Sequence, residues 1–180
     1  MMHLKKLKAL DYEVLSELMK NSKTSDRSLA KKLGVSQPTI TRRRGTLEKE
    51  GYLKYTGIPD FKKVGLKLMA FNFLSWTSEG ETASVTRAKD FIEKVSSFLR
   101  RYPNVIFAAT GKGLGMGRVS ISLHKDYADY VNFIRSLQHE WGQYLDKHDV
   151  FLVSLESDHV IRQLSLACLG EYIGGSKGGE

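Results

Sequence analysis

The chain has 180 residues, of which 41% are hydrophobic and 27% are charged, so it can form one large globular domain or two small ones. It contains no apolar run near the ~18 residues that a membrane-spanning helix needs, and residues 1–13 lack the apolar core of a signal peptide. A single cysteine, Cys168, excludes an intramolecular disulfide and a multi-cysteine metal site. We therefore expect a soluble, cytoplasmic protein.

The formal net charge is +8, and most of the basic excess lies in the first third of the chain. Residues 1–60 hold 13 Lys and Arg against 7 Asp and Glu, whereas residues 61–180 hold 15 against 13. A basic surface binds nucleic-acid phosphates through the release of counterions. Charge alone does not decide the function, because many modestly basic domains bind no nucleic acid.

Two short amphipathic helices are predicted before residue 35. The first begins with Asp11 as its N-cap and runs to about Asn21, and Leu10 and Leu15 are spaced to form a hydrophobic staple. The second covers residues 25–33 and ends at a glycine. Their buried stripes comprise Val14, Leu15, Leu18 and Met19 in the first helix, and Leu29, Ala30 and Leu33 in the second.

Residues 36–50 (SQPTITRRRGTLEKE) predict a third helix with a polar start and three consecutive arginines. Ser36 is a suitable N-cap, and Pro38 falls in the first turn, where a missing amide costs little. Ile40 and Leu47 are seven residues apart and share one face. The other side chains of this helix are therefore free to point elsewhere.

The second and third predicted helices are joined as in a helix-turn-helix. Ala30 is the small residue needed where the helices cross, Gly34 tolerates the positive φ of the turn, and Ile40 is the apolar anchor. The third helix then corresponds to one that lies in a DNA groove. We expect DNA contacts from Lys31, Lys32, Ser36, Gln37, Thr39, Thr41, Arg42, Arg43 and Arg44.

These contacts are expected to differ in kind. Arg42 and Arg43 are predicted to bind the groove or phosphates, because a guanidinium forms bidentate bonds to guanine or phosphate. Ser36 is expected to cap the helix and to touch a phosphate, while Lys31 and Lys32 either contact the DNA backbone or only increase solubility. By their place at the helix start, the expected base readers are Gln37, Thr39 and Thr41.

The remainder of the chain predicts an α+β, ferredoxin-like βαββαβ sandwich. Residues 52–58 alternate as a short strand or wing does, residues 66–77 predict a strand, residues 78–81 a turn, and apolar residues keep helical spacing from Thr82 to Tyr102. Two strands at 105–110 and 118–124, a helix from Asp126 to Trp141, and a strand at 150–155 follow. This order is typical of a split βαβ fold with helices on one face.

Three regions are expected from these elements. Residues 1–60 form a winged helix-turn-helix domain with its linker, and residues 61–173 form a ferredoxin-like assembly or effector domain. Within the latter, residues 159–173 form either an extra edge strand or a helix, since the spacing of apolar residues does not distinguish them. Residues 174–180 (GGSKGGE) are expected to be a disordered tail.

The glycine-rich segment 111–117 (GKGLGMG) does not have nucleotide-binding spacing, and it joins two strands, so no helix N-terminus is available for a phosphate. It is interpreted as a flexible hairpin or an effector loop, in which Lys112 and Arg118 leave room for an anionic ligand. The candidate effector residues are Gly111, Lys112, Gly113 and Arg118. The five histidines lack paired ligand spacing, so neither a metal site nor a cofactor is predicted.

A basic winged helix-turn-helix followed by βαββαβ resembles the Lrp/AsnC, or feast/famine, family of bacterial and archaeal transcription regulators, over roughly residues 10–156. The N-terminal match is specific, whereas the C-terminal match is mostly one of pattern. The residues that carry the resemblance are Leu10-Asp11, Leu29 to Ser36, Thr39 to Arg43, Leu47 to Gly51, and Asp60 and Leu66 after Lys63-Val64-Gly65.

The resemblance implies a homodimer or an assembly of dimers that pair through their C-terminal domains, with an amino acid or similar small effector between subunits. A two-fold axis would place two recognition helices about one DNA turn (~34 Å), or a multiple of it, apart. Two departures stand out. The family pattern has an aliphatic residue where Arg44 stands, and region 111–118 lacks the acid of the family's effector region.

The competing hypothesis is an enzyme, because some relatives with this plan are tetrapyrrole (siroheme) decarboxylases that have lost DNA binding. Such an enzyme would not need a recognition helix that is polar and then basic, and this chain keeps one. We therefore expect a sequence-specific regulator of transcription that binds double-stranded DNA and is not an enzyme. A regulator without any small effector remains an open alternative.

Overall fold

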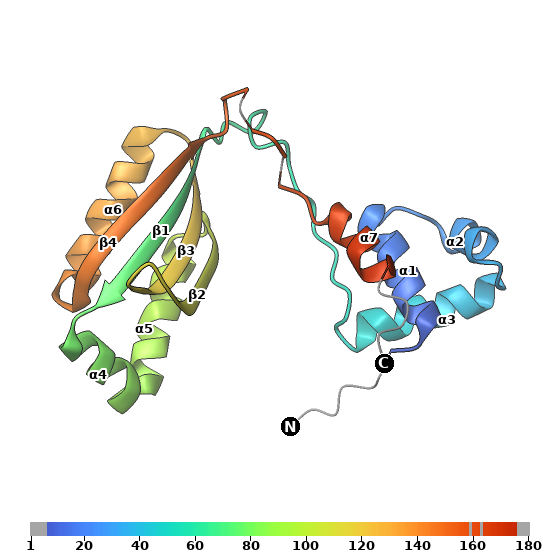
Figure 1. Cartoon of the computed structure of the whole chain (residues 1–180), viewed down its shortest axis with the longest axis horizontal. Coiled ribbons are helices and arrows are strands. Elements are labelled where there is room, and N and C mark those ends of the chain that lie inside the picture. The colour runs from blue at the N-terminus through green and yellow to red at the C-terminus, as the bar shows by residue number, and fades with distance from the viewer. Residues whose placement is uncertain (1–6, 159, 163, 176–180) are drawn as a thin grey trace. The chain divides into compact units, whose positions relative to one another are not determined.

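The computed structural model describes residues 7–158, 160–162 and 164–175. The chain divides into two compact units, one formed by Pro59–Ile161 and the other by described residues of 7–58 and 162–175 (Figure 1). The division near residue 60 lies between Ile58 and Pro59. The expected second domain, 61–173, is too long, because residues from 162 onward group with the N-terminal helices.

Four helices build the N-terminal unit: α1 (Ala9–Lys20), α2 (Asp26–Leu33), α3 (Gln37–Lys49) and α7 (Ala167–Gly175). The expected apolar stripes of the first three helices meet in one core, which confirms the helix-turn-helix arrangement. Burial of these aliphatic side chains is the main force that holds the short helices together. The buried core residues are Val14, Leu15, Leu18, Leu29, Ala30, Ile40 and Leu47.

The ends of α2 and α3 agree with the prediction from the sequence, but the start of α1 does not. Gly34 and Gly51 adopt φ of 67° and 77° at the ends of α2 and α3, as a left-handed terminus requires. In α1 the N-cap is Lys8, and Asp11 accepts a hydrogen bond from the Lys8 backbone N at 2.8 Å. The expected cap at Asp11 and the staple of Leu10 with Leu15 are therefore wrong by three residues.

Two further local predictions are corrected. The Ser36 hydroxyl lies 2.8 Å from the Thr39 hydroxyl and caps no backbone amide of α3. Residues 52–58 form no strand, and among the described residues strand pairing is confined to the sheet of the other unit. Tyr52 and Leu53 instead pack against the helical core, and the chain after them has no strand to pair with.

Helix α7 shows that residues 167–173 of the open segment 159–173 are helical, and it packs against α1, whereas the described residues between 160 and 166 form neither a helix nor a strand. The Ser16 hydroxyl donates a 2.6 Å hydrogen bond to the Gly170 carbonyl. A Cβ at Gly170 would lie 2.6 Å from the Ser16 backbone oxygen, so only glycine allows this approach. Gly174 and Gly175 belong to α7, while residues 159 and 176–180 lie outside the described residues.

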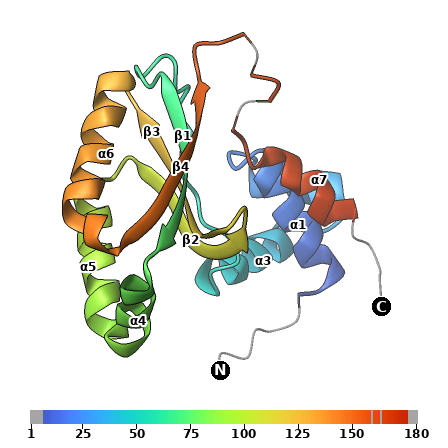
Figure 2. The same cartoon turned by 60° about the vertical axis from the view of Figure 1, so that its left-hand side comes forward.

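The second unit is the predicted ferredoxin-like sandwich. Its antiparallel sheet has the order β2-β3-β1-β4, and helices α5 and α6 cover one face of it (Figure 2). Their apolar faces enclose a core of Leu74, Phe98, Phe133, Leu137 and Trp141. The elements are β1 (Leu68–Trp76), α4 (Ser78–Thr86), α5 (Ala88–Arg101), β2 (Val105–Gly113), β3 (Met116–His124), α6 (Tyr127–Trp141), a 3-10 turn (Gly142–Tyr144) and β4 (Leu145–Ser154).

Two segments of this unit differ from expectation. Residues 78–81 are not a turn but the first turn of α4, where the Thr77 hydroxyl accepts from the Gly80 N at 3.1 Å. The single helix expected from Thr82 to Tyr102 is broken at Arg87, whose φ of −120° and ψ of 38° are not helical. In α4, before the break, Gly80 packs closely against Trp76 and Tyr144.

The glycine-rich segment 111–117 forms the hairpin between β2 and β3, as the first of its two interpretations expected. Its turn consists of Leu114 and Gly115, with φ of 54° and 70°, and the flanking glycines belong to β2 and β3. Positive φ at both central residues is the geometry that matches the twist of paired strands.

No helix among the described residues is long and apolar enough to cross a membrane.

Candidate nucleic-acid interface

The recognition helix α3 is oriented by its buried side. Ile40 and Leu47 are fully buried in the core of the N-terminal unit, so residues on the opposite side of the helix face outward. Gln37 and Arg42 are exposed there, and Thr39 is half-buried. This part of the prediction holds: the start of α3 presents polar side chains and a cation to solvent.

The three consecutive arginines of α3 have three different environments. Successive helical residues point about 100° apart, so Arg42, Arg43 and Arg44 cannot all face the same groove. The Arg42 side chain is exposed and has no hydrogen-bond or ion-pair partner within the described part of the chain. Arg43 and Arg44 are half-buried and bound to carboxylates of the same unit.

Arg43 pairs with α1. Its Nη1 lies 3.1 Å from Oδ1 and 3.3 Å from Oδ2 of Asp11, whose own side chain is buried. The carboxylate also accepts the Lys8 amide, so Asp11 links the start of α1 to the middle of α3. The Arg43 Nε is buried and has no partner in the described residues. The guanidinium that was expected in the groove is thus held inside the unit.

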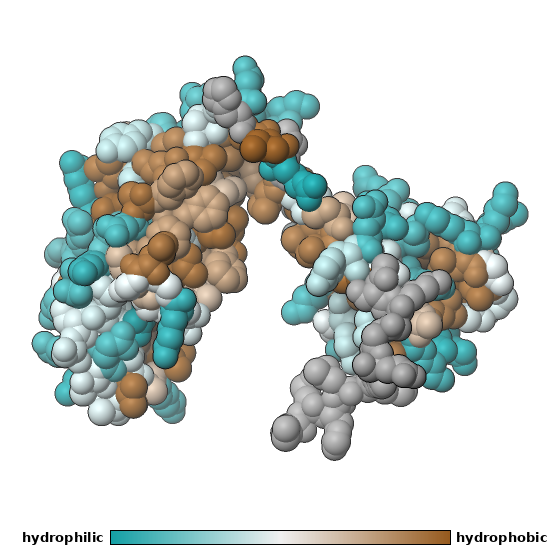
Figure 3. Space-filling model, in the orientation of Figure 1, coloured by the Kyte–Doolittle hydropathy of each residue, from teal (hydrophilic) through white to brown (hydrophobic). Residues whose placement is uncertain are grey.

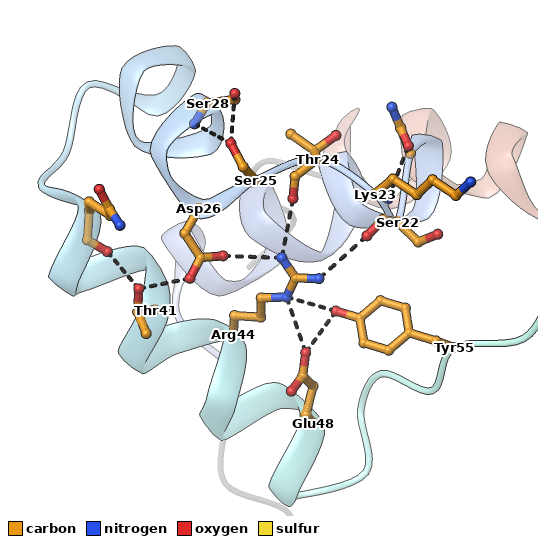
Figure 4. A network of polar contacts seen from close by, with 12 residues as sticks. Ser22, Lys23, Thr24, Ser25, Asp26, Ser28, Thr41, Arg44, Glu48 and Tyr55 are labelled. Atoms are coloured by element: carbon orange, nitrogen blue, oxygen red, sulfur yellow. Dashed lines mark hydrogen bonds and ion pairs between the residues drawn. The ribbon is translucent and has the colours of Figure 1, made fainter.

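Arg44 is the centre of a polar network between α2, α3 and the segment that follows α3 (Figure 4). Its Nη1 lies 3.1 Å from Asp26 Oδ1, and its Nε lies 3.1 Å from Glu48 Oε1 and 2.9 Å from the Tyr55 hydroxyl. Nη1 and Nη2 also donate to the Thr24 and Ser22 carbonyls. The network replaces the aliphatic contact that the family pattern places here.

The electrostatics of this network favour the charged guanidinium. Burial alone lowers the pKa of Arg44, but hydrogen bonds to Asp26, Glu48 and Tyr55 outweigh burial and raise it. Burial and the hydrogen bond to Glu48 raise the pKa of Tyr55. Thr41 joins the same network, because its hydroxyl donates to Asp26 Oδ2 at 2.7 Å (Figure 4).

The remaining cations predicted for this surface lie on α2. Lys31 is exposed, and Lys32 forms an ion pair with Glu17 of α1. The hydrogen bond from Lys32 is the main cause that lowers the pKa of Glu17, and burial opposes it. Of the nine predicted residues, those with outward-facing side chains free of a carboxylate partner are Lys31, Ser36, Gln37, Thr39 and Arg42.

The candidate effector residues lie in the second unit. Gly111, Lys112 and Gly113 are at the end of β2, while Arg118 on β3 binds Glu81 through two hydrogen bonds of 2.7 and 3.1 Å. Glu81 was missed in the sequence, because it precedes Arg118 by 37 residues and lies in a segment expected to be a turn. No local spacing signals this pair.

Comparisons with known proteins agree with this architecture. A family model described as winged helix-turn-helix DNA-binding matches residues 7–54. The HTH-type transcriptional regulator LrpC of Bacillus subtilis (strain 168) is 28% identical over 130 residues, which cover 71% of this chain and 83% of LrpC.

Two solved structures share the fold. An AsnC family transcriptional regulator from Agrobacterium tumefaciens has a TM-score of 0.68 at 22% identity, covering 91% of this chain and 99% of that one. The transcriptional regulator NMB0573 from Neisseria meningitidis, solved as a complex with L-Met, has a TM-score of 0.69 at 20% identity, covering 89% and 96%. In its helix-turn-helix, its ferredoxin-like unit and its similarity to LrpC, this chain resembles DNA-binding transcription regulators of the Lrp/AsnC type.

Proposed function

We propose that this protein is a cytoplasmic, sequence-specific regulator that reads double-stranded DNA with the start of α3. The observation that carries the proposal is the exposed polar side of α3, where Arg42 is a cation with no partner among the residues that the structure describes. Gln37 and Thr39 read base edges, and Arg42 contacts guanine or phosphate. Ser36 and Lys31 contact the DNA backbone, as does Lys32 when it exchanges Glu17 for a phosphate.

Arg43, Arg44 and Thr41 have a different role in this proposal. They are bound to Asp11 and Asp26 of the same unit, so they fix the angle of α3 against α1 and α2. A recognition helix that is held rigidly loses little conformational entropy when it enters the groove. These residues therefore contribute to DNA affinity through the position of the helix, without contacting the DNA.

We further propose that the protein is a homodimer, or an assembly of dimers, that pairs through the sheet face opposite to α5 and α6. Phe107, Ile121, Phe71 and Phe151 lie in register across all four strands on that face. Phe107 and Phe151 are 50% and 65% exposed, and hydrophobic residues gather over the strands (Figure 3). An exposed apolar face of this kind is typical of a protein interface.

A small effector such as an amino acid would modulate this assembly, as the L-Met complex of the Neisseria meningitidis relative suggests. Arg118 is the charged group that supports the proposal, with Gly111, Lys112 and Gly113 at the neighbouring end of β2. We propose no enzymatic activity for this chain. Neither the fold nor the relatives favour the decarboxylase alternative.

In vitro selection of sheared genomic DNA near physiological salt tests the proposed DNA recognition. The wild type should enrich discrete sites, and the double variant Gln37→Ala, Arg42→Ala should lose them. The matched control is Gln138→Ala, Arg135→Ala on α6, which removes the same two residue types from exposed positions of the other unit. Equal enrichment by wild type and the α3 variant would refute the proposed interface.

The dimer proposal is tested by sedimentation equilibrium. Phe151→Lys should convert the wild-type assembly to a smaller species, because it places a charge within the apolar face, on the edge strand β4. Tyr127→Lys is the matched control, since Tyr127 is 64% exposed at the start of α6. An unchanged mass for Phe151→Lys would exclude this face as the interface.

A further inference from the structure

The ferredoxin-like unit contains a cavity of about 430 Å³ between the sheet and its helices. This volume lies within the range of about 300–1,000 Å³ that is typical of small-molecule sites. Side chains from β1, β2, β3, α5 and α6 supply a largely apolar wall, which includes Phe91, Val95, Leu99, Val105 and Trp141. The cavity therefore suits a ligand with a hydrocarbon or aromatic body.

Arg118 is the one charged residue among the described residues that line the cavity. The other polar lining groups are hydroxyls and the indoles of Trp76 and Trp141, and no carboxylate is present among them. Such a lining can bind an anionic head group, but it offers no acidic partner to an ammonium group. Its hydroxyl-bearing residues are Ser84, Ser96, Thr110 and Ser120.

The Arg118 guanidinium is already engaged by an anion from α4. It binds both oxygens of Glu81 and lies 4.9 Å from the centroid of the Trp76 ring. The hydrogen bond from Arg118 lowers the pKa of Glu81 and outweighs the opposing effect of burial. The Glu81 side chain is 54% exposed and does not line the cavity, so it can move into solvent when another carboxylate takes its place.

A second lining group lacks a partner. The Trp76 Nε1 is buried and has no hydrogen-bond acceptor among the described residues. Buried indole donors normally have an acceptor, because leaving one unpaired is costly. Trp76 therefore provides an unused donor in the wall of a cavity whose only charge is positive.

We propose that this cavity binds an organic acid that has an apolar body and no amino group. The body fills the space between α5 and the sheet, the carboxylate replaces Glu81 on Arg118, and a ligand oxygen gives Trp76 Nε1 its missing acceptor. Displacement of Glu81 removes a contact that holds α4 to β3. The inference rests on the proposed small effector and replaces the amino acid given above as its example with an organic acid that lacks an ammonium group and binds in this cavity.

Intrinsic fluorescence tests the site directly, because both tryptophans of the protein, Trp76 and Trp141, line the cavity. The full-length protein is titrated, without DNA, with octanoate below its micellar range, with 1-octanol and with 2-aminooctanoate. Octanoate should produce a saturable change in fluorescence. The other two compounds should bind at least about tenfold more weakly, because 1-octanol lacks the negative charge and 2-aminooctanoate carries an ammonium group that would be unpaired in the cavity. No saturable change with octanoate, or equal binding of 2-aminooctanoate, would overturn the proposal.

Three variants locate the binding. Arg118→Met should weaken octanoate about tenfold or more, since it removes the charge at similar length. Ala108→Phe retains Arg118 but fills the cavity, and it should abolish the fluorescence change. Arg100→Met is the control, because Arg100 pairs with Glu93 on α5 and does not line the cavity.

The variants remain decisive if one of them fails to fold. If circular dichroism shows that Arg118→Met is unfolded, the test of the site rests on Ala108→Phe. If folded Ala108→Phe binds octanoate as tightly as the wild type does, octanoate binds outside the cavity. The titration contains no DNA, so it is independent of the selection experiment. Octanoate binding without DNA recognition would refute the proposed regulator and retain the ligand site. DNA recognition without octanoate binding would refute the ligand site and retain the proposed regulator.

Discussion

Arg43 Nη1 lies 3.1 Å from Asp11 Oδ1, and this pair fixes the recognition helix to the first helix of the same unit. The neighbouring Arg42 faces solvent and has no carboxylate partner in the described part of the chain. Two adjacent arginines with the same local sequence signature thus have opposite roles, because one turn of α3 cannot point both of them outward. The roles can be separated by measuring stability and DNA affinity in the same pair of variants.

Arg43→Ala should lower the free energy of unfolding by about 1–3 kcal/mol, because it leaves the buried Asp11 carboxylate without its cationic partner. Arg42→Ala, the matched neighbour, should change it by less than about 0.5 kcal/mol, as expected for an exposed position. Urea denaturation followed by circular dichroism measures both values. Equal losses in the two variants would show that Asp11 does not depend on Arg43.

The salt dependence of DNA binding should distinguish the same two variants. If Arg42 contacts a phosphate, Arg42→Ala reduces the slope of log affinity against log salt by about 0.9, the value for one contact on duplex DNA. Arg43→Ala should leave the slope unchanged, since its charge is already paired within the protein. Fluorescence anisotropy with a selected site, at four or more salt concentrations, gives the slopes. A reduced slope for Arg43→Ala would place Arg43 at the DNA.

The sequence predicts the helix-turn-helix well because its signals are local. A small residue, a glycine with positive φ and an apolar anchor fall within the eleven positions from Ala30 to Ile40, and all three occupy their expected places. The partners of Arg43 and Arg44 could not be predicted in this way. Asp11 and Asp26 lie 32 and 18 residues away along the chain, so only the folded core brings them to α3.

The Arg44 network should be cooperative between Arg44 and Tyr55. Each of the variants Arg44→Lys and Tyr55→Phe should destabilise the protein by about 1 kcal/mol, because each removes hydrogen bonds to the same Glu48 carboxylate. The double variant should lose less than the sum of the two, as expected for residues in direct contact. Urea denaturation of the four proteins completes the cycle.

Tyr12→Phe serves as the control for that cycle, since Tyr12 is exposed on α1 and lies outside the network. It should have a free energy of unfolding close to the wild type. Strict additivity of Arg44→Lys and Tyr55→Phe would show that the contacts of Figure 4 do not act as one network.

Two glycine-to-alanine substitutions should have opposite effects on stability. Gly170→Ala places a Cβ 2.6 Å from the Ser16 backbone oxygen and 3.0 Å from Lys20 Cγ, so α7 must shift away from α1 and the protein should lose stability. Gly45→Ala meets nothing within 4 Å inside α3 and should gain up to about 1 kcal/mol from helix propensity. Thermal unfolding without DNA compares them, and a stable Gly170→Ala would indicate that α7 does not require its close approach to α1.

The helix α7 also shows a limit of the sequence analysis. The spacing of apolar residues in 159–173 does not distinguish a helix from a strand, and the pattern contains no sign of the partner of this segment. Ser16, against which Gly170 packs, lies 154 residues away from it along the chain. The ferredoxin-like order could be predicted because its strands and helices alternate along the chain, whereas this long-range helix packing could not.

A buried polar chain crosses the sheet beneath α6. Ser122 Oγ lies 2.9 Å from His124 Nε2 and accepts from Asn72 Nδ2 at 3.2 Å, and Asn72 Oδ1 lies 3.2 Å from His148 Nε2. His124 also lies 3.4 Å from an Asp129 carboxylate oxygen. Burial lowers the pKa of His124 despite the opposing effect of Asp129, and burial likewise lowers the pKa of His148 despite Asp149.

Stability should therefore fall on the acid side of neutrality. Near the ordinary histidine pKa of about 6.5, both histidines bind fewer protons in the folded protein than in the unfolded chain, because burial lowers their pKa. Their neutral forms favour folding above that pH, and the contribution is lost as pH falls from about 6.5 towards the lowered folded pKa values. Urea denaturation between pH 5 and 8 should show this loss in the wild type. The double variant His124→Asn, His148→Asn should show a smaller loss, and His139→Asn on the exposed side of α6 should follow the wild type. An identical pH dependence in wild type and double variant would exclude these two histidines as its cause.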